Sequence, residues 1–252
     1  MSANTLTNAV SIRLSKTLPQ RLRVGGVVPF TATDFPGKLA AVIFVQGCPW
    51  RCGYCHNPHL QSREADSAIA WDDVMALLRR RVGLIDAVVF SGGEPTIDPA
   101  LGGAIEDVRQ LGFAIGLHTA CIYPDHLARV LPLVDWVGFD VKAPFDDYEK
   151  ITGVGNSGNK ARACVELIMA SGVEHECRTT AHPALLAEGE ILALAAGMAQ
   201  RGVKSYALQL VRERGCNDPR LRGRSLADYP STDTLQQLAA MFPRFTLRRA
   251  DA

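Results

Sequence analysis

Six strand-like runs, each followed by a stretch with helical periodicity, constrain the fold of this chain more than any other feature. The strand-like runs lie at residues 39–45, 87–90, 113–117, 136–139, 176–180 and 206–211. The helical stretches lie at residues 71–82, 100–111, 124–131, 160–170, 188–200 and 233–242. Most of the runs are continuously apolar, which is typical of parallel strands covered on both faces. The alternation therefore predicts an α/β fold with a parallel sheet and helices outside it.

Polar residues follow each run, at the point where the strand is expected to end. They are Cys48 and the residues after it, Glu94, Thr119, Asp140 with Lys142, residues 178–182, and Gln209 with Arg212. In barrel-like α/β folds the chemistry lies at the carboxyl ends of the strands. We therefore expect these side chains to converge on one rim. This convergence indicates an enzyme without reliance on any single motif.

Three cysteines, Cys48, Cys52 and Cys55, follow the first of these runs with the spacing C-x3-C-x2-C. Three close thiolates suit a soft metal centre such as zinc or iron–sulfur. A structural zinc site normally has four protein ligands, and no further cysteine stands at a suitable spacing. His56 or His59 could complete such a site, so the residues alone leave both kinds of metal centre open.

The composition argues against several kinds of partner. The 252 residues are 47% hydrophobic, which is enough for one large core. With 27 basic and 26 acidic residues, the chain has no charge excess that would favour nucleic acid or an anionic membrane surface. Its apolar runs are far shorter than a membrane span, and the first residues lack the pattern of a secretory signal.

We expect residues 1–22 to form a loose tail and residues 23–252 to form a single domain. The tail is poor in acidic residues, so it also has a faint resemblance to an organelle transit peptide. The chain has seven cysteines, and an odd number with three clustered indicates a reducing compartment, which we take to be the cytoplasm. The other four are expected to be buried or incidental thiols: Cys121, Cys164, Cys177 and Cys216.

Three motifs occur together in this chain. They are Cys48-x3-Cys52-x2-Cys55 with the aromatic Tyr54 before the last cysteine, Gly92-Gly93-Glu94-Pro95, and Asp140-Val141-Lys142. In this order the motifs resemble those of the radical S-adenosylmethionine (radical SAM) superfamily. The resemblance implies a partial (β/α)6 barrel similar to a TIM barrel. It also implies one [4Fe–4S] cluster held by the three cysteines, with one iron left open for S-adenosylmethionine.

The same resemblance implies roles for residues around the cluster. Tyr54 would lie near the adenine of S-adenosylmethionine. The segment of Gly92, Gly93 and Glu94 would bind its amino group, and Glu94 offers an acceptor for a cation. Lys142 would meet the carboxylate of S-adenosylmethionine.

Further roles are implied at the ends of three other strands. Asp140 would lie beside the ribose or a bound cation, and Thr119 would lie on the ribose side. Gln209 occupies a strand-end position of the family's activating enzymes. His118 stands where those enzymes often carry an acid, which weakens the case for a monovalent cation near Asp140.

Within the superfamily, residues 26–30, 34–37 and 46–58 resemble the activating proteins of anaerobic ribonucleoside-triphosphate reductases. Pyruvate formate-lyase activating enzymes are close relatives. The resemblance implies that a donor such as flavodoxin or ferredoxin reduces the cluster by one electron. S-adenosylmethionine is then cleaved to methionine and a 5′-deoxyadenosyl radical, which removes hydrogen from a glycine of the partner, a glycyl-radical enzyme.

Two other functions remain open on the sequence. One is a radical SAM enzyme with a small-molecule substrate, such as a 7-carboxy-7-deazaguanine synthase. The other is a structural or interaction protein that binds zinc through the three cysteines and His56 or His59. A protein of this second kind would contain zinc and no labile sulfide.

Overall fold

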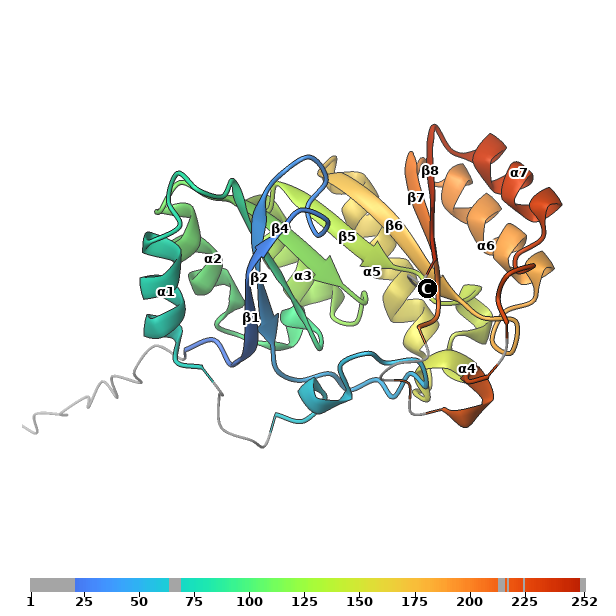
Figure 1. Ribbon diagram of the computed structural model, residues 1–252, viewed down its shortest axis with the longest axis horizontal. Helices are drawn as coiled ribbons and strands as arrows, with labels where there is room; N and C mark the ends of the chain where they lie inside the picture. Colours follow the sequence, from blue (N-terminus) through green and yellow to red (C-terminus); the bar gives the residue numbers. More distant parts are fainter. Residues whose placement is uncertain (1–20, 64–68, 213–215, 217, 224, 250–252) are drawn as a thin grey trace, which may run out of the picture.

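The computed structural model describes residues 21–249 except 64–68, 213–215, 217 and 224. One open sheet of eight strands runs through the described chain, and the strands lie side by side in the order of the sequence (Figure 1). The strands are β1 (Val24–Thr31), β2 (Ala40–Val45), β3 (Ala87–Gly92), β4 (Ala114–Thr119), β5 (Trp136–Asp140), β6 (Glu174–Ala181), β7 (Ser205–Leu210) and β8 (Arg244–Arg248). β1 pairs antiparallel with β2, and every later neighbour pair is parallel.

The described ranges contain seven α-helices, and most of them cover the outer face of the sheet (Figure 1). They are α1 (Trp71–Arg79), α2 (Leu101–Arg109), α3 (Pro124–Val130), α4 (Glu149–Thr152), α5 (Ser157–Ser171), α6 (Glu188–Gln200) and α7 (Thr232–Met241). Short 3-10 helices add η1 (Pro58–Leu60), η2 (Pro95–Ile97), η3 (Leu131–Leu133), η4 (Phe145–Asp147) and η5 (Pro219–Leu221). None of the helices in the described ranges is both long and apolar enough to cross a bilayer.

Two apolar clusters on opposite faces explain why the strands are continuously apolar. Val88 and Phe90 of β3 belong to the large cluster that packs under the helices. Ala87 and Val89 of the same strand face the inside of the curved sheet, where they pack with Trp136. Because successive side chains of a strand point to opposite faces, a strand buried on both faces needs apolar residues at every position.

The parallel register brings the carboxyl ends of the strands to one edge. Val45 of β2 lies opposite Gly92 of β3. Asp140 of β5 lies opposite Arg178 of β6, and Thr180 of β6 lies opposite Gln209 of β7. The polar residues that follow the strands in sequence therefore become neighbours in space.

The structure confirms the α/β class and the partial barrel. The six expected strands are β2 to β7, and the sheet stays open because β1 and β8 form its two edges. Several details differ from the expectation. β8 was not predicted, and α1 ends at Arg79 instead of residue 82. α5 begins at Ser157 instead of residue 160, and the short α4 precedes it.

The expected tail, residues 1–22, falls mostly on residues 1–20, which lie outside the described residues. Leu22 is only 3% exposed and packs in the large cluster, so the folded part begins before β1. The single domain over residues 23–252 stays a prediction. The chain after β7 does two things: residue Asp218 contacts the cysteine loop, and β8 extends the sheet.

Candidate active site

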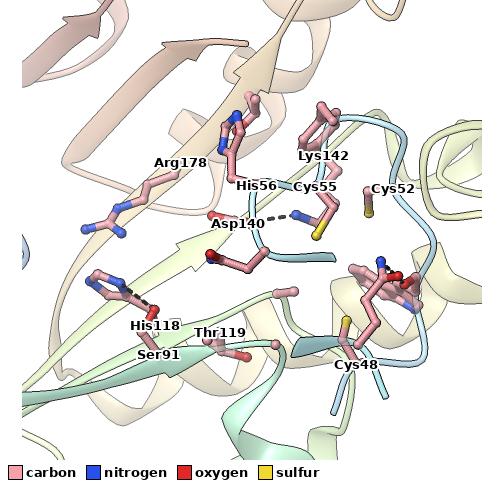
Figure 2. A pocket seen from close by; sticks show the side chains of 18 of the residues that line it. Cys48, Cys52, Cys55, His56, Ser91, His118, Thr119, Asp140, Lys142 and Arg178 are labelled. Atoms are coloured by element: carbon pink, nitrogen blue, oxygen red, sulfur yellow. Dashed lines mark hydrogen bonds and ion pairs between the residues drawn. The ribbon is translucent and has the colours of Figure 1, made fainter. Parts of the chain in front are cut away.

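A pocket opens at the carboxyl ends of the strands, inside the curve of the sheet (Figure 2). All predicted site residues except Glu94 line it: Cys48, Cys52, Cys55, Tyr54, Gly92, Gly93, Thr119, Asp140, Lys142 and Gln209. They come from the loop after β2 and from the ends of β3, β4, β5 and β7. Residues far apart in the sequence thus share one pocket, as expected where parallel strands end at one rim.

The loop that carries the three cysteines is held by its backbone. The Gly47 N–H donates to the Leu60 carbonyl at 2.7 Å, and the Cys48 N–H donates to the Gln61 carbonyl at 3.1 Å. In the middle of the loop, the Asp218 N–H donates to the Gly53 carbonyl at 3.3 Å. These contacts fix both ends and the middle of the loop, which gives the thiols defined positions.

The three thiols fit an iron–sulfur cluster better than a single metal ion. Figure 2 shows the sulfur atoms of Cys48, Cys52 and Cys55 around one hollow. In the described part of the chain, however, no three His, Cys, Asp or Glu side chains are close enough to hold one ion together. This spacing counts against a zinc site completed by His56 or His59, and thiolates are the usual ligands of iron–sulfur clusters.

Burial keeps two of these thiols protonated while no metal is bound. It raises the pKa of Cys48 to about 12, and it also raises the pKa of Cys52. Metal ligands must be thiolates, so loading of the site has to release protons.

The Gly92-Gly93 turn brings main chain to the pocket wall beside the cysteine loop. Gly92 has φ +116°, and a Cβ at this position would lie 2.5 Å from the Val45 nitrogen. A Cβ on Gly93 would lie 2.4 Å from the Gly47 carbonyl oxygen. Both positions therefore require glycine, because any side chain would push the turn away from the base of the loop.

The carboxylate of Glu94 lies behind the pocket wall. Its Oε1 accepts hydrogen bonds from the Thr96 N–H at 3.1 Å, the Thr96 hydroxyl at 2.6 Å and the Thr119 hydroxyl at 2.9 Å. Its Oε2 accepts from the Ala120 N–H at 2.7 Å. Burial raises the pKa of Glu94, whereas these hydrogen bonds favour its charged form. The side chain joins η2 to the end of β4 and is 0% exposed.

We expect the Glu94→Gln variant to lose stability. The amide NH2 of glutamine would face groups that also donate hydrogen bonds, and hydrogen bonds to a charged group contribute roughly 1.5–3 kcal/mol each. We expect a lower Tm and an unchanged iron content. Binding of S-adenosylmethionine should weaken, because the Gly92-Gly93 turn that Glu94 supports would be displaced. The exposed Glu106 supplies the control, Glu106→Gln. An unchanged Tm with selective loss of S-adenosylmethionine binding would instead indicate direct contact with the ligand.

Asp140 and Lys142, at the end of β5, form an ion pair on another wall of the pocket. Lys142 Nζ lies 2.8 Å from Asp140 Oδ2 and 5.5 Å from the centre of the Tyr54 ring. Burial lowers the pKa of Lys142, but the charges of Asp140 and, more weakly, of Tyr54, Cys52 and Tyr148 together outweigh it, so the pKa lies well above its usual value. Lys142 is therefore a cation that is only 5% exposed, at the edge of the hollow between the sulfurs.

His118 stands at the position where the family's activating enzymes often carry an acidic residue. Its Nε2 is 2.9 Å from the Asp34 carbonyl oxygen, so this nitrogen carries the hydrogen, and Nδ1 accepts from the Ser91 hydroxyl at 3.3 Å. Burial, with a smaller effect of Arg178, holds the pKa of His118 well below its usual value. Asp140 is the only carboxylate among the described residues that line the pocket.

The buried neutral imidazole predicts a pH-dependent stability. Below about pH 6.5 the unfolded chain binds a proton at His118 that the folded protein does not bind. The free energy of unfolding should therefore decrease as the pH is lowered, by up to about 1.4 kcal/mol per pH unit. The His118→Gln variant should lose this part of the slope between pH 6.5 and 5. Denaturant unfolding of both proteins across this range tests the expectation, and identical slopes would contradict it.

Sequence reasoning missed how Arg178 is held. Its guanidinium lies 5.2 Å from the Trp136 ring, and Nε donates to Glu176 Oε1 at 2.8 Å. A Cβ on Gly138 would come within 2.8 Å of the guanidinium carbon. Glycine in the middle of β5 therefore makes room for Arg178 on the pocket wall, and an isolated glycine within a strand was the available signal.

The sequence profile described as "Radical SAM superfamily" matches residues 42–190, which is more than half of the 252 residues. The chain belongs to the radical SAM superfamily. The matched segment contains the three cysteines, the Gly92-Gly93 turn and the Asp140–Lys142 pair.

Among the relatives, a Methanocaldococcus jannaschii protein named "Putative glycyl-radical enzyme activating enzyme" is 27% identical over 88% of this chain and 92% of its own. The pyruvate formate-lyase-activating enzyme of Clostridium pasteurianum is 31% identical over 54% of this chain and 59% of its own. The 7-carboxy-7-deazaguanine synthase of Methanopyrus kandleri is 32% identical over 44% of this chain and 52% of its own. The chain thus spans under two thirds of the last two relatives.

The crystal structure of Streptococcus suis SuiB bound to precursor peptide SuiA superposes on this radical SAM chain with a TM-score of 0.65. The two sequences are 15% identical, and the superposition covers 82% of this chain and 48% of SuiB. At this identity the likeness shows a shared fold.

Proposed function

We propose that this radical SAM protein is an activase that generates a glycyl radical on a partner enzyme. The observation that carries the proposal is the shared pocket: three thiols surround a hollow whose other walls present the Gly92-Gly93 turn and the Lys142 cation. Such a site has protein ligands on one side and space with polar groups on the other, which suits a cluster that must leave one iron open.

In this proposal Cys48, Cys52 and Cys55 hold one [4Fe–4S] cluster. When bound, the cluster would supply the one electron that cleaves S-adenosylmethionine to methionine and a 5′-deoxyadenosyl radical, which would remove hydrogen from a glycine of the partner enzyme. Lys142 binds the carboxylate of S-adenosylmethionine, and the Gly92-Gly93 backbone binds its amino group. The chain's own contribution is to hold this ligand in one pose, since orientation is a large part of such catalysis.

The other lining residues complete the binding site for S-adenosylmethionine. Tyr54 packs toward the adenine, and Thr119 and Asp140 face the ribose. Gln209 lies on the rim, where its Nε2 is 3.5 Å from the Thr180 hydroxyl. Glu94 supports the turn from behind.

The proposed partner is an anaerobic ribonucleotide reductase, on the strength of the resemblance at residues 26–30, 34–37 and 46–58. The match to an activating enzyme over nearly all of both chains supports the activase class. A pyruvate formate-lyase-type partner has support from the Clostridium pasteurianum relative. A small-molecule reaction has support from the deazaguanine synthase. The proposal implies a low-potential donor such as flavodoxin or ferredoxin, and the cytoplasm as compartment.

Anaerobic purification and reconstitution test the proposal. We expect about four irons and four sulfides per chain, and cleavage of S-adenosylmethionine after reduction. Incubation with the reductase should give a glycyl-radical doublet in the electron paramagnetic resonance (EPR) spectrum of that partner. A colourless protein with one zinc and no sulfide would reject the proposal. Turnover of a small molecule without any protein partner would favour the synthase alternative.

A further inference from the structure

Residues 145–152 form a short segment that contacts both the end of β5 and the cysteine loop. It contains η4 and α4 and follows directly on the Asp140–Lys142 end of β5. We name residues 145–152 the bridging segment. Figure 1 shows α4 at the same edge of the molecule as the loop after β2. Its residues touch both the ion pair and the cysteine loop, as two sets of contacts show.

The first set of contacts fixes the end of β5. The Lys142 N–H donates to the Tyr148 hydroxyl at 3.0 Å, and that hydroxyl donates to the Asp140 carbonyl oxygen at 3.3 Å. Tyr148 is 1% exposed, so water cannot replace these bonds. One hydroxyl thus holds the main chain of the two residues whose side chains form the ion pair.

The second set of contacts fixes the cysteine loop. The Tyr148 ring packs edge-on against Trp50, with 5.7 Å between ring centres. The Arg51 N–H donates to the Thr152 carbonyl at 2.9 Å. Trp50 and Arg51 lie between Cys48 and Cys52, so the bridging segment supports the part of the loop that carries two of the three thiols.

We propose that Tyr148 is a positioning residue that sets the Lys142 cation and the cysteine loop in register with each other. Tyr148 does not line the pocket. It acts at two ends of one side chain: the hydroxyl positions Lys142, and the ring positions the cysteine loop through Trp50. The role in ligand binding rests on the proposed function, because Lys142 is there assigned to the carboxylate of S-adenosylmethionine.

Two substitutions separate the two ends of the side chain. Tyr148→Phe removes only the hydroxyl and with it both hydrogen bonds to the end of β5. We expect this variant to keep wild-type iron while binding of S-adenosylmethionine weakens by about tenfold, because the main chain that carries Lys142 and Asp140 is left with unpaired buried groups. Tyr148→Leu also removes the ring, and we expect it to lower the iron content after reconstitution.

Tyr229→Phe is the matched control. Tyr229 is also buried, and its hydroxyl donates to the Leu186 carbonyl at 2.8 Å, outside the residues that line the pocket. Loss of this bond should also lower Tm. It should leave iron content and S-adenosylmethionine binding unchanged, so a general loss of stability is separated from a change at the site.

Three readouts test the proposal without reference to turnover. They are the Kd of S-adenosylmethionine for the reconstituted protein, the change that S-adenosylmethionine causes in the EPR spectrum of the reduced cluster, and hydrogen exchange of the Lys142 amide. We expect Tyr148→Phe to weaken binding, to reduce the spectral change and to speed the exchange of Lys142 selectively. The proposal is overturned if Lys142→Met loses binding while Tyr148→Phe keeps wild-type values in all three. It is also overturned if Tyr148→Leu keeps full iron.

Failure of the proposed function would look different. Wild-type protein would then hold no cluster or bind no S-adenosylmethionine. Hydrogen exchange of Lys142 in Tyr148→Phe against Tyr229→Phe would still decide whether Tyr148 fixes the end of β5. Equal exchange in these two variants would overturn the positioning role in that case as well.

Discussion

Replacement of Cys48, Cys52 or Cys55 by alanine is expected to abolish the cleavage of S-adenosylmethionine. Each thiol lines the same pocket, and no other cysteine in the described ranges does. In the proposed function, the loss of one thiol would leave the cluster with two protein ligands, because no other cysteine of the described ranges lines the pocket to replace it. We expect the cleavage activity of the reconstituted variants to fall by at least a hundredfold. Their iron and sulfide contents should fall as well.

Cys164→Ala is the control for these substitutions. Cys164 is fully buried in α5 and does not line the pocket. This variant should lose some stability through the small cavity that alanine leaves, but it should keep iron, sulfide and cleavage activity. Retention of cleavage by any of the three pocket variants would reject the assignment of the cluster to these thiols.

Lys142→Met is expected to have the second largest effect. Methionine keeps the length and most of the volume of lysine and removes the charge. A charge-assisted contact between lysine and the carboxylate of S-adenosylmethionine contributes roughly 1.5–3 kcal/mol, so the Kd should rise about 10- to 150-fold. Iron content should stay at the wild-type level, because Lys142 has no role as a cluster ligand. Titration of the reconstituted variant with S-adenosylmethionine measures the change.

The ion pair complicates this experiment, and a double variant resolves it. Lys142→Met leaves the Asp140 carboxylate without its partner, and the side chain of Asp140 is only 33% exposed. The unpaired Asp140 carboxylate would repel the carboxylate of S-adenosylmethionine or distort the main chain around it. In Asp140→Asn with Lys142→Met, this charge is absent as well. Binding should remain weak in the double variant if Lys142 contacts the ligand, and recovery would show that the stranded carboxylate caused the loss.

The fold could be predicted largely from local sequence. β2 to β5 and β7 are almost continuously apolar because both of their faces are covered, and helical periodicity marked the segments between the strands. Ser231 caps α7, since its hydroxyl accepts from the Thr234 N–H at 3.3 Å, and serine before an amphipathic stretch is a local signal for a helix start. β8 escaped prediction because Arg244–Arg248 is short, half polar and an edge strand, so only pairing with β7 defines it.

The membership of the pocket could be predicted because it depends on topology alone. Residues that follow parallel strands meet at one edge of the sheet, independently of the direction in which their side chains point. The direction of each side chain depends instead on three-dimensional packing. Glu94 shows this: the positive φ of Gly92 and the tight contact of Gly93 with the loop turn its carboxylate toward Thr96 and Thr119. No pattern along the chain indicates that direction.

The agreement between strand order and chain order has a consequence for how the protein is made. Every pairing in the sheet joins a strand to the one synthesised just before it, so each new hairpin or strand–helix unit can dock while the next is still on the ribosome. No strand has to wait for a distant partner, which keeps unpaired edges short-lived. The cysteine loop emerges early, but its contact at Gly53 depends on Asp218. The contact that holds the cysteine loop at Gly53 therefore forms only after Asp218 has been synthesised.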